Sequence, residues 1–249
     1  MRLVSLVPSL TRTLCDLGCA SSIVGITKFC IDPPSLYRNS VIVGGTKDPD
    51  IDLIKSLKPT HIFVNLEENR ASDVESLEKI SVIYKSFPKG PADLPLMFRE
   101  LGEILSLPTA EKFANEIEEK ILRFRVLDKK RFLYFIWQKP YILAGTDTYI
   151  SRVLESFGWE NACNQSQSRY PTVTSQDLLQ CFPEILLLSS EPYPFRKRDV
   201  KPLAKIYTEK IPIKKADGKL LSWWGSPFLE CFDQMSSYGS QKCYIIRDF

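Results

Sequence analysis

Two stretches of the chain, PDIDLIKSLKPTHIFVNLEE at residues 49–68 and PTVTSQDLLQCFPEILLLSSE at residues 171–191, contain the same elements in the same order. In each stretch a short helical segment with paired leucines stops at a proline, a buried strand follows the proline, and an acidic loop follows the strand. The same number of residues separates the proline from the glutamate in both stretches. One such unit in each half predicts two similar lobes, and lobes of this kind bind ligands in the cleft between them.

The rest of the first half alternates strands with helices. Apolar runs of strand length take turns with segments of helical periodicity. The predicted strands are residues 3–7, 23–26, 61–65 and 82–84, and the predicted helices are residues 10–17 with Ser9 as their cap, 50–57, 71–79 and 95–105, while residues 42–45 lead into a turn. This order is typical of a small parallel sheet with helices on both faces.

A longer amphipathic helix is predicted next, at residues 109–127, where no proline or glycine interrupts the apolar spacing. The alternation then resumes, with strands at 132–137, 141–144, 185–188 and 244–246 and helices at 148–157, 175–181, 200–205 and 225–235. We therefore predict an α/β protein with a mainly parallel sheet in each lobe. The N-terminal lobe covers residues 1–105, the connecting helix 106–130 and the C-terminal lobe 131–249.

Composition limits the class of protein. The 249 residues are 44% hydrophobic and 25% charged, with a formal net charge of +3, which is ordinary for a soluble globular protein. This charge is too small to favour nucleic acid as a partner, and the basic run at residues 195–198 reads as a solvated loop. No apolar stretch approaches the roughly 20 residues of a membrane span. Each lobe reads as self-contained, so we expect a monomer.

The seven cysteines favour a reducing compartment, because an odd number leaves at least one unpaired. Cys15 and Cys19 share a helical face, but no further Cys or His cluster completes a metal site. The cysteines are therefore read as small buried hydrophobes. The N-terminal sequence has no signal peptide pattern, so the chain is expected in the cytoplasm if it is translated as given.

The sequence offers little for catalysis, and we predict that the protein is not an enzyme and holds no metal or cofactor of its own. His61 is the only histidine and reads as a structural residue at a strand start. No glycine-rich phosphate loop and no Gly-x-Ser-x-Gly elbow is present. We predict that Asp147 caps a helix and is not a catalytic general base.

The chemistry lies just after the strands, because open α/β sheets bind ligands beyond the carboxyl ends of their strands. Those ends carry many aromatic side chains, which offer broad, flat contact at little entropic cost. They suit a large, flat, partly apolar ligand. The candidates at the strand ends are Pro8, Ser9, Phe29, Asn69, Arg70, Trp137, Tyr193, Trp223 and Trp224. At least one of the paired tryptophans is expected at the cleft.

Six motifs in chain order resemble the helical-backbone (class III) solute-binding proteins of ABC importers, the vitamin B12, iron-siderophore and haem receptors. After the opening VSLVPSLT at residues 4–11, they are VGGTK at 43–47, EENR at 67–70, ILAGTDT at 142–148, RYP at 169–171, SSEPYPF at 189–195 and LSWWGS at 221–226. The subgroup most similar to this chain is the one labelled cobalamin-binding. The motif RYP adds Arg169 and Tyr170 to the candidate ligand-binding residues.

The resemblance implies two Rossmann-like lobes joined by one stiff helix, with the ligand in the cleft between them. It also implies that an acidic side chain on each lobe docks onto arginines of a permease dimer. The matching positions are Glu67 or Glu68 in the first lobe and Glu191 in the second. Two separated carboxylates set the orientation of a two-fold partner through charge-assisted hydrogen bonds. The alternative is that these glutamates cap the helices that follow.

The identity of the ligand stays open at this point. A corrinoid such as cobalamin is the first expectation. An anionic ferric siderophore would require cleft arginines, for which Arg70, Arg169 and Arg196 are candidates, and haem is the third ligand of the family. The family implies a periplasmic or other extracytoplasmic location. A cytosolic cofactor carrier or enzyme on the same fold is the alternative from a different functional class.

Overall fold

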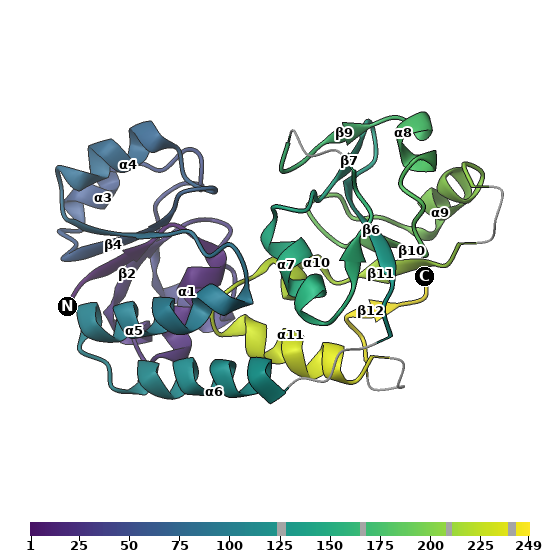
Figure 1. Cartoon of the computed structure of the whole chain (residues 1–249). Coiled ribbons are helices and arrows are strands. Elements are labelled where there is room, and N and C mark those ends of the chain that lie inside the picture. Colours follow the sequence, from purple (N-terminus) through teal and green to yellow (C-terminus); the bar gives the residue numbers. More distant parts are fainter. Residues whose placement is uncertain (124–127, 165–167, 208–210, 239–242) are drawn as a thin grey trace. The chain divides into compact units, whose positions relative to one another are not determined.

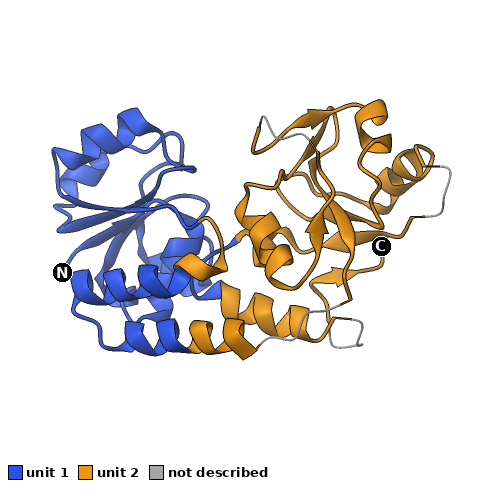
Figure 2. Cartoon of the chain, in the orientation of Figure 1, with its two compact units in different colours: residues 1–88, 94–115, 223–227 blue, residues 89–93, 116–222, 228–249 orange. Residues whose placement is uncertain are grey.

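The structure is a computed structural model that describes residues 1–123, 128–164, 168–207, 211–238 and 243–249. The chain forms two compact units (Figures 1 and 2). Unit 1 comprises residues 1–88, 94–115 and 223–227, and unit 2 comprises residues 89–93, 116–222 and 228–249. The expected class, an α/β fold with one sheet in each half, is confirmed.

Unit 1 is built on a five-stranded sheet in the order β3-β2-β1-β4-β5, and every neighbouring pair is parallel. Its strands are β1 (Leu3–Ser5), β2 (Ile23–Ile26), β3 (Val41–Ile42), β4 (His61–Asn65) and β5 (Val82–Ser86). The second and fourth of these strands have the predicted bounds. The parallel order places the carboxyl ends of all five strands along one edge of the sheet.

Helices cover both faces of this sheet, as predicted (Figure 1). They are α1 (Pro8–Asp16), α2 (Pro34–Asn39), α3 (Ile51–Ser56), α4 (Ala71–Glu78), α5 (Leu94–Leu105) and the first part of α6 (Thr109–Arg123), with a short 3₁₀ turn at Ala20–Ser22. Alternate residues of β4 explain the two faces, because Ile62 and Val64 belong to the cluster with Ile54 of α3 and Leu77 of α4. Phe63 between them points to the opposite face and contacts Tyr84 of β5.

The boundary between the units falls inside α6, between Asn115 and Glu116. The predicted helix at residues 109–127 is present from Thr109 to Arg123, and the rest of it lies outside the described residues. Two short segments are exchanged between the halves of the chain. Residues 89–93 of the first half belong to unit 2, and residues 223–227 of the second half belong to unit 1. The predicted division into lobes and a connecting helix, at residues 105 and 130, stays a prediction. The compact units differ from this division at the two short segments.

Unit 2 contains a seven-stranded mixed sheet in the order β12-β11-β10-β6-β7-β9, with β8 paired to β6. Its strands are β6 (Arg131–Trp137), β7 (Tyr141–Leu143), β8 (Glu160–Asn161), β9 (Thr172–Val173), β10 (Ile185–Ser189), β11 (Ile213–Ala216) and β12 (Ile246–Arg247). The centre, where β10 lies between β6 and β11, is parallel as predicted. Toward the two ends of the sheet the pairing becomes antiparallel, with β12 paired to β11 on one side and β7 to β6 and β9 on the other, which the sequence patterns did not predict.

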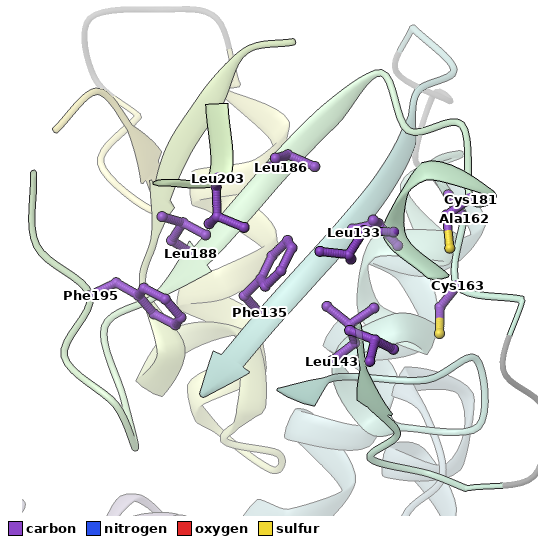
Figure 3. Packing of buried hydrophobic residues seen from close by; sticks show 12 residues of the cluster. Leu133, Phe135, Leu143, Ala162, Cys163, Cys181, Leu186, Leu188, Phe195 and Leu203 are labelled. Atoms are coloured by element: carbon purple, nitrogen blue, oxygen red, sulfur yellow. The ribbon is translucent and has the colours of Figure 1, made fainter. Parts of the chain in front are cut away.

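The helices of unit 2 are α7 (Tyr149–Ser156), α8 (Ser175–Leu179), α9 (Lys197–Ala204), α10 (Gly218–Ser222) and α11 (Pro227–Ser236, from Phe228 in this unit), with a 3₁₀ turn at Pro91–Asp93. Figure 3 shows how one face of the sheet is buried. Leu133 and Phe135 of β6 pack with Leu186 and Leu188 of β10 in this cluster. Leu203 of α9 belongs to the same cluster, so this helix covers the central strands.

Several local predictions were wrong for identifiable reasons. Ser9 does not cap α1, because Val7 takes that place and Pro8 begins the helix with the dihedral angle that its ring fixes. Asp147 does not cap α7, since the hydroxyl of Thr148 accepts the Ser151 N–H at 3.3 Å. The predicted helix at 225–235 begins two residues later, because Gly225 has a positive φ of 85°.

Candidate functional site

The repeated stretches have the same local backbone in both units. Lys58 precedes Pro59 with a φ of 47°, and Phe182 precedes Pro183 with a φ of 48°. Both are left-handed conformations that end a helical segment and turn the chain into the next strand. The repetition that the sequence predicted is therefore present at the level of individual dihedral angles.

The ends of the two strands are also alike. Asn65 is the last residue of β4, and its Oδ1 accepts the N–H of Glu67 at 2.9 Å and that of Glu68 at 3.1 Å. Ser189 is the last residue of β10, and its Oγ accepts the N–H of Glu191 at 3.3 Å. In both units a side chain at the strand end holds the backbone of the glutamate two residues later.

The acidic loop of unit 1 is fixed from several sides. The Lys47 ammonium donates to the backbone carbonyl of Glu67 at 2.8 Å. The buried Asn69 amide donates to the Thr46 carbonyl at 2.9 Å and accepts the Asn65 N–H at 2.8 Å. Asn69 therefore ties its own loop to the loop that precedes α3, and its predicted contact with a ligand stays a prediction.

The carboxyl group of Glu68 in this loop is affected by its surroundings. Burial raises the pKa of Glu68 to about 7, and the adjacent Glu67 carboxylate adds to the rise while Lys47 opposes it. Glu68 therefore changes charge near neutral pH.

The acidic loop of unit 2 lies against the start of α10. A Cβ on Gly218 would lie 2.7 Å from Glu191 Cγ, so glycine lets the glutamate stem pack over the helix end. Glu191 is exposed as a residue. The packing of its stem nevertheless desolvates the carboxyl group and raises the pKa of Glu191. The Asp217 carboxylate adds to this rise, and Lys219 opposes it.

None of the three glutamates caps the helix that follows it, so that alternative is wrong. The N-cap of α4 is Arg70, and the N-cap of α9 is Arg196, whose backbone N–H donates to Asp199 at 2.7 Å. The basic run at residues 195–198 is not the solvated loop that we expected, because its first residue, Phe195, is buried and α9 begins at Lys197.

The candidate residues at the amino-terminal end of unit 1 differ in accessibility. Pro8 is half-buried, and Ser9 is buried, with no hydrogen-bond partner for its hydroxyl among the described residues. The Phe29 ring is half exposed, and the Lys28 ammonium lies over it at 5.4 Å from its centroid. Phe29 is therefore an accessible aromatic surface beside a cation.

The tryptophan pair lies in the segment of residues 223–227 that joins unit 1. Its backbone packs directly on α1, because the Ser226 N–H donates to the Thr13 hydroxyl at 3.1 Å. Trp224 is only 5% exposed, whereas Trp223 is half-buried. Of the two, Trp223 offers the more accessible ring, and its contact with a ligand stays a prediction.

Unit 2 brings two candidate aromatic residues into contact. Trp137, at the end of β6, lies edge-on to Tyr193 with ring centroids 5.5 Å apart. The Tyr193 hydroxyl donates to Gln138 Oε1 at 2.7 Å, and its ring also contacts buried Phe195 at 4.8 Å. Because Trp137 is 40% exposed, the group presents an aromatic surface that packing and one hydrogen bond hold in place.

Two of the three candidate arginines differ in their surroundings. Arg169 is half-buried and pairs with Asp147 at 3.4 Å, while the adjacent Tyr170 is 38% exposed. Arg70 is exposed at the start of α4. The Asp147 carboxylate is itself exposed, so this surface pair offsets only part of the Arg169 charge.

The cysteines and the single histidine are the remaining candidates for site chemistry. Among the residues that the structure describes, no disulfide joins any of the seven cysteines, and no cluster of three or more potential metal ligands occurs. The His61 ring lies 3.1 Å from the Thr60 hydroxyl at the start of β4. In the same described part of the chain, no helix has the length and apolar character needed to cross a membrane.

Sequence reasoning missed two residues that shape the acidic loops. Lys47 lies in one of the quoted motifs, but its bond to the Glu67 carbonyl joins residues far apart in the chain. Gly218 follows Asp217 at the start of a short helix, and nothing in the local sequence links it to Glu191. Only the folded structure shows these contacts.

Comparison with known proteins gives a consistent result. A family model described as "Periplasmic binding protein" matches residues 3–205. The vitamin B12-binding protein of Vibrio vulnificus (strain YJ016) is 23% identical over 194 residues, covering 76% of this chain and 71% of that protein. The high-affinity heme uptake system protein IsdE of Staphylococcus aureus (strain bovine RF122 / ET3-1) is 24% identical and covers 75% and 65%.

Solved structures share the fold. The periplasmic vitamin B12 binding protein BtuF of Vibrio cholerae superposes with a TM-score of 0.81 at 18% identity and covers 95% of both chains. The periplasmic heme binding protein HutB of Vibrio cholerae gives 0.79 at 19% identity and covers 95% of this chain and 98% of its own. At these identities the likeness concerns the fold alone.

Proposed function

Since the chain belongs to the periplasmic binding protein family, we propose that it is a solute-binding protein that captures a large, flat cofactor-type ligand and presents it to an ABC importer. The predicted cleft between the lobes is the proposed place of capture. The members of the family and the structural relatives named above are binding proteins, which supports binding rather than turnover as the activity.

One observation carries this proposal, namely that both units present the same strand end followed by a glutamate. The backbone N–H of Glu67 and that of Glu191 are each held by the side chain two residues before. Neither glutamate caps the helix that follows its loop, because Arg70 and Arg196 take those places. We propose that they dock onto arginines of a permease dimer. Glu68 is the alternative docking residue in unit 1.

The ligand we propose first is a corrinoid such as cobalamin. Aromatic surface follows the strands in both units, from Trp137 and Tyr193 in unit 2 and from Phe29 in unit 1. In unit 1, Trp223 of the motif LSWWGS supplies a further ring. Because Asp147 pairs with Arg169, one of the three candidate arginines is partly neutralised, which favours a ligand without a large negative charge. The remaining proposed contacts are Pro8, Ser9, Asn69, Arg70, Tyr170 and Trp224.

The test is a titration of the purified protein by calorimetry and absorbance with cobalamin, cobinamide, haemin and a panel of ferric siderophores. We expect submicromolar binding of a corrinoid, weakened at least tenfold by Trp223→Ala. Phe182→Ala is the matched control, because this exposed aromatic residue precedes β10 instead of following a strand. If only haemin or a siderophore binds tightly, that compound replaces the corrinoid as the proposed ligand. If no compound of the panel binds, the proposal is contradicted.

We further propose that the protein is a monomer, and that it lies outside the cytoplasmic membrane as members of its family do. Each unit has its own hydrophobic cluster, so neither needs a second copy to bury its core. Light scattering of the purified protein measures the mass, and fractionation of the producing cells measures the location. A cytoplasmic location would favour a cofactor carrier on the same fold.

A further inference from the structure

The side chains of the last residues of β4 and β10 hold the backbone of the loops that follow these strands. Asn65 and Ser189 are buried, and each accepts the backbone N–H of a glutamate in the loop that follows. These two residues differ in type, so the two halves of the chain reach the same backbone arrangement with an amide in one unit and a hydroxyl in the other.

In unit 1 the amide of Asn65 is engaged at both ends. Its Oδ1 accepts the N–H groups of Glu67 and Glu68, and its Nδ2 donates to the Ser86 carbonyl of β5 at 3.1 Å. The orientation of the amide is therefore fixed by the neighbouring strand. A rigid acceptor of this kind fixes the backbone of both glutamates together.

In unit 2 the hydroxyl of Ser189 is engaged in the same way. It donates to the backbone carbonyl of Glu191, accepts the N–H of Glu191, and contacts the hydroxyl of Tyr134 at 3.0 Å. Tyr134 is fully buried in β6, so this anchor also comes from the neighbouring strand of the sheet.

We propose that Asn65 and Ser189 are positioning residues for docking, each of which presents the glutamate of its loop to the permease in a preset direction. This inference rests on the docking role proposed above. Holding the loop before the encounter lowers the conformational entropy that is lost on binding. A partner with two arginine sites gains most when both loops are set in advance.

The first measurement is amide hydrogen exchange of the full chain by NMR. Asn65→Ala is expected to speed exchange at Glu67 and Glu68 at least tenfold, and Ser189→Ala to do so at Glu191. Ser56→Ala is the control in unit 1, because this exposed hydroxyl donates to the Leu53 carbonyl within α3. Ser236→Ala is the control in unit 2, because this exposed hydroxyl donates to the Phe232 carbonyl within α11. Unchanged exchange in the alanine variants would overturn the inference.

The second measurement is the affinity of each variant for the ABC permease of the producing organism, purified in nanodiscs. We expect a loss of about fivefold or more for each alanine variant, with the two controls close to wild type. Glu67→Gln, Glu68→Gln and Glu191→Gln report on the docking role itself. If any of them weakens binding while the alanine variants do not, only the positioning role fails. If wild type does not bind, or binds no better than all three glutamine variants, the proposed docking fails, and the positioning role fails with it.

Discussion

Lys58 and Phe182 occupy equivalent places in the two units, and both adopt left-handed backbone conformations immediately before a proline. Neither residue is glycine, which adopts this conformation at no steric cost. Both side chains are exposed, at the surface end of a helical segment. The turn is therefore set by the chain around it, and each unit holds a modestly strained residue at the same point.

We predict that Lys58→Gly raises the free energy of unfolding by about 0.5–1 kcal/mol, because it removes the left-handed strain at little cost in packing. Phe182→Gly is expected to behave alike. Lys55→Gly, within α3, is the control and is expected to lower stability by about 1 kcal/mol. Urea unfolding measures all three. Destabilisation by both glycines at the turns would show that these residues are not strained.

We predict that Glu68 makes stability depend on pH near neutrality. Its pKa of about 7 in the folded state lies above that of the unfolded chain, so folding favours the protonated carboxyl. Stability is therefore expected to rise as pH falls from about 8 towards the unfolded pKa, by about 1–2 kcal/mol. Glu68→Gln should remove this rise, and Glu75→Gln, exposed on α4, should retain it. Equal pH profiles in wild type and Glu68→Gln would contradict the prediction.

The aromatic group of unit 2 gives a prediction about ligand affinity. Tyr193→Phe keeps the ring contacts with Trp137 but removes the hydrogen bond to Gln138, so we expect a loss of about two- to fivefold. Trp137→Ala removes an exposed ring and is expected to cost tenfold or more. Calorimetry with the tetrapyrrole that binds most tightly measures both changes. Equal affinity in all three proteins would place the ligand elsewhere.

The fold could be predicted where the sequence carries a local signal. Apolar residues dominate both 23–26 and 61–65, with the continuous run Ile62–Val64 at the centre of the second, and these segments form β2 and β4 with the predicted bounds. β11 was missed, because its sequence Ile-Lys-Lys-Ala has no apolar alternation. Its Lys214 pairs with Asp248, which follows the edge strand β12, at 2.7 Å, so the contacts of this strand are with residues distant in sequence.

The same limit applies to the candidate site. The acidic loops could be located from sequence because they directly follow apolar strands. The residues that hold them belong partly to other elements, as Ser86 and Tyr134 show. Such contacts depend on which strands are neighbours in the sheet, and strand order has no local signal.

The segment of residues 223–227 gives the last prediction. Gly225 has a φ of 85°, and a Cβ there would lie 2.1 Å from the Thr13 hydroxyl of α1. Gly225→Ala therefore combines backbone strain with a steric clash, and we expect it to lower the free energy of unfolding by about 3 kcal/mol.

Gly18→Ala is the matched control, because Gly18 has a φ of 91° but its added Cβ would meet nothing within 4 Å. It should cost only the backbone strain, about 1 kcal/mol. Thermal unfolding separates the two variants, since each kcal/mol shifts Tm by about 2–4 °C in a protein of this size. Equal shifts for both alanines would mean that the segment carrying the tryptophans is not packed against Thr13.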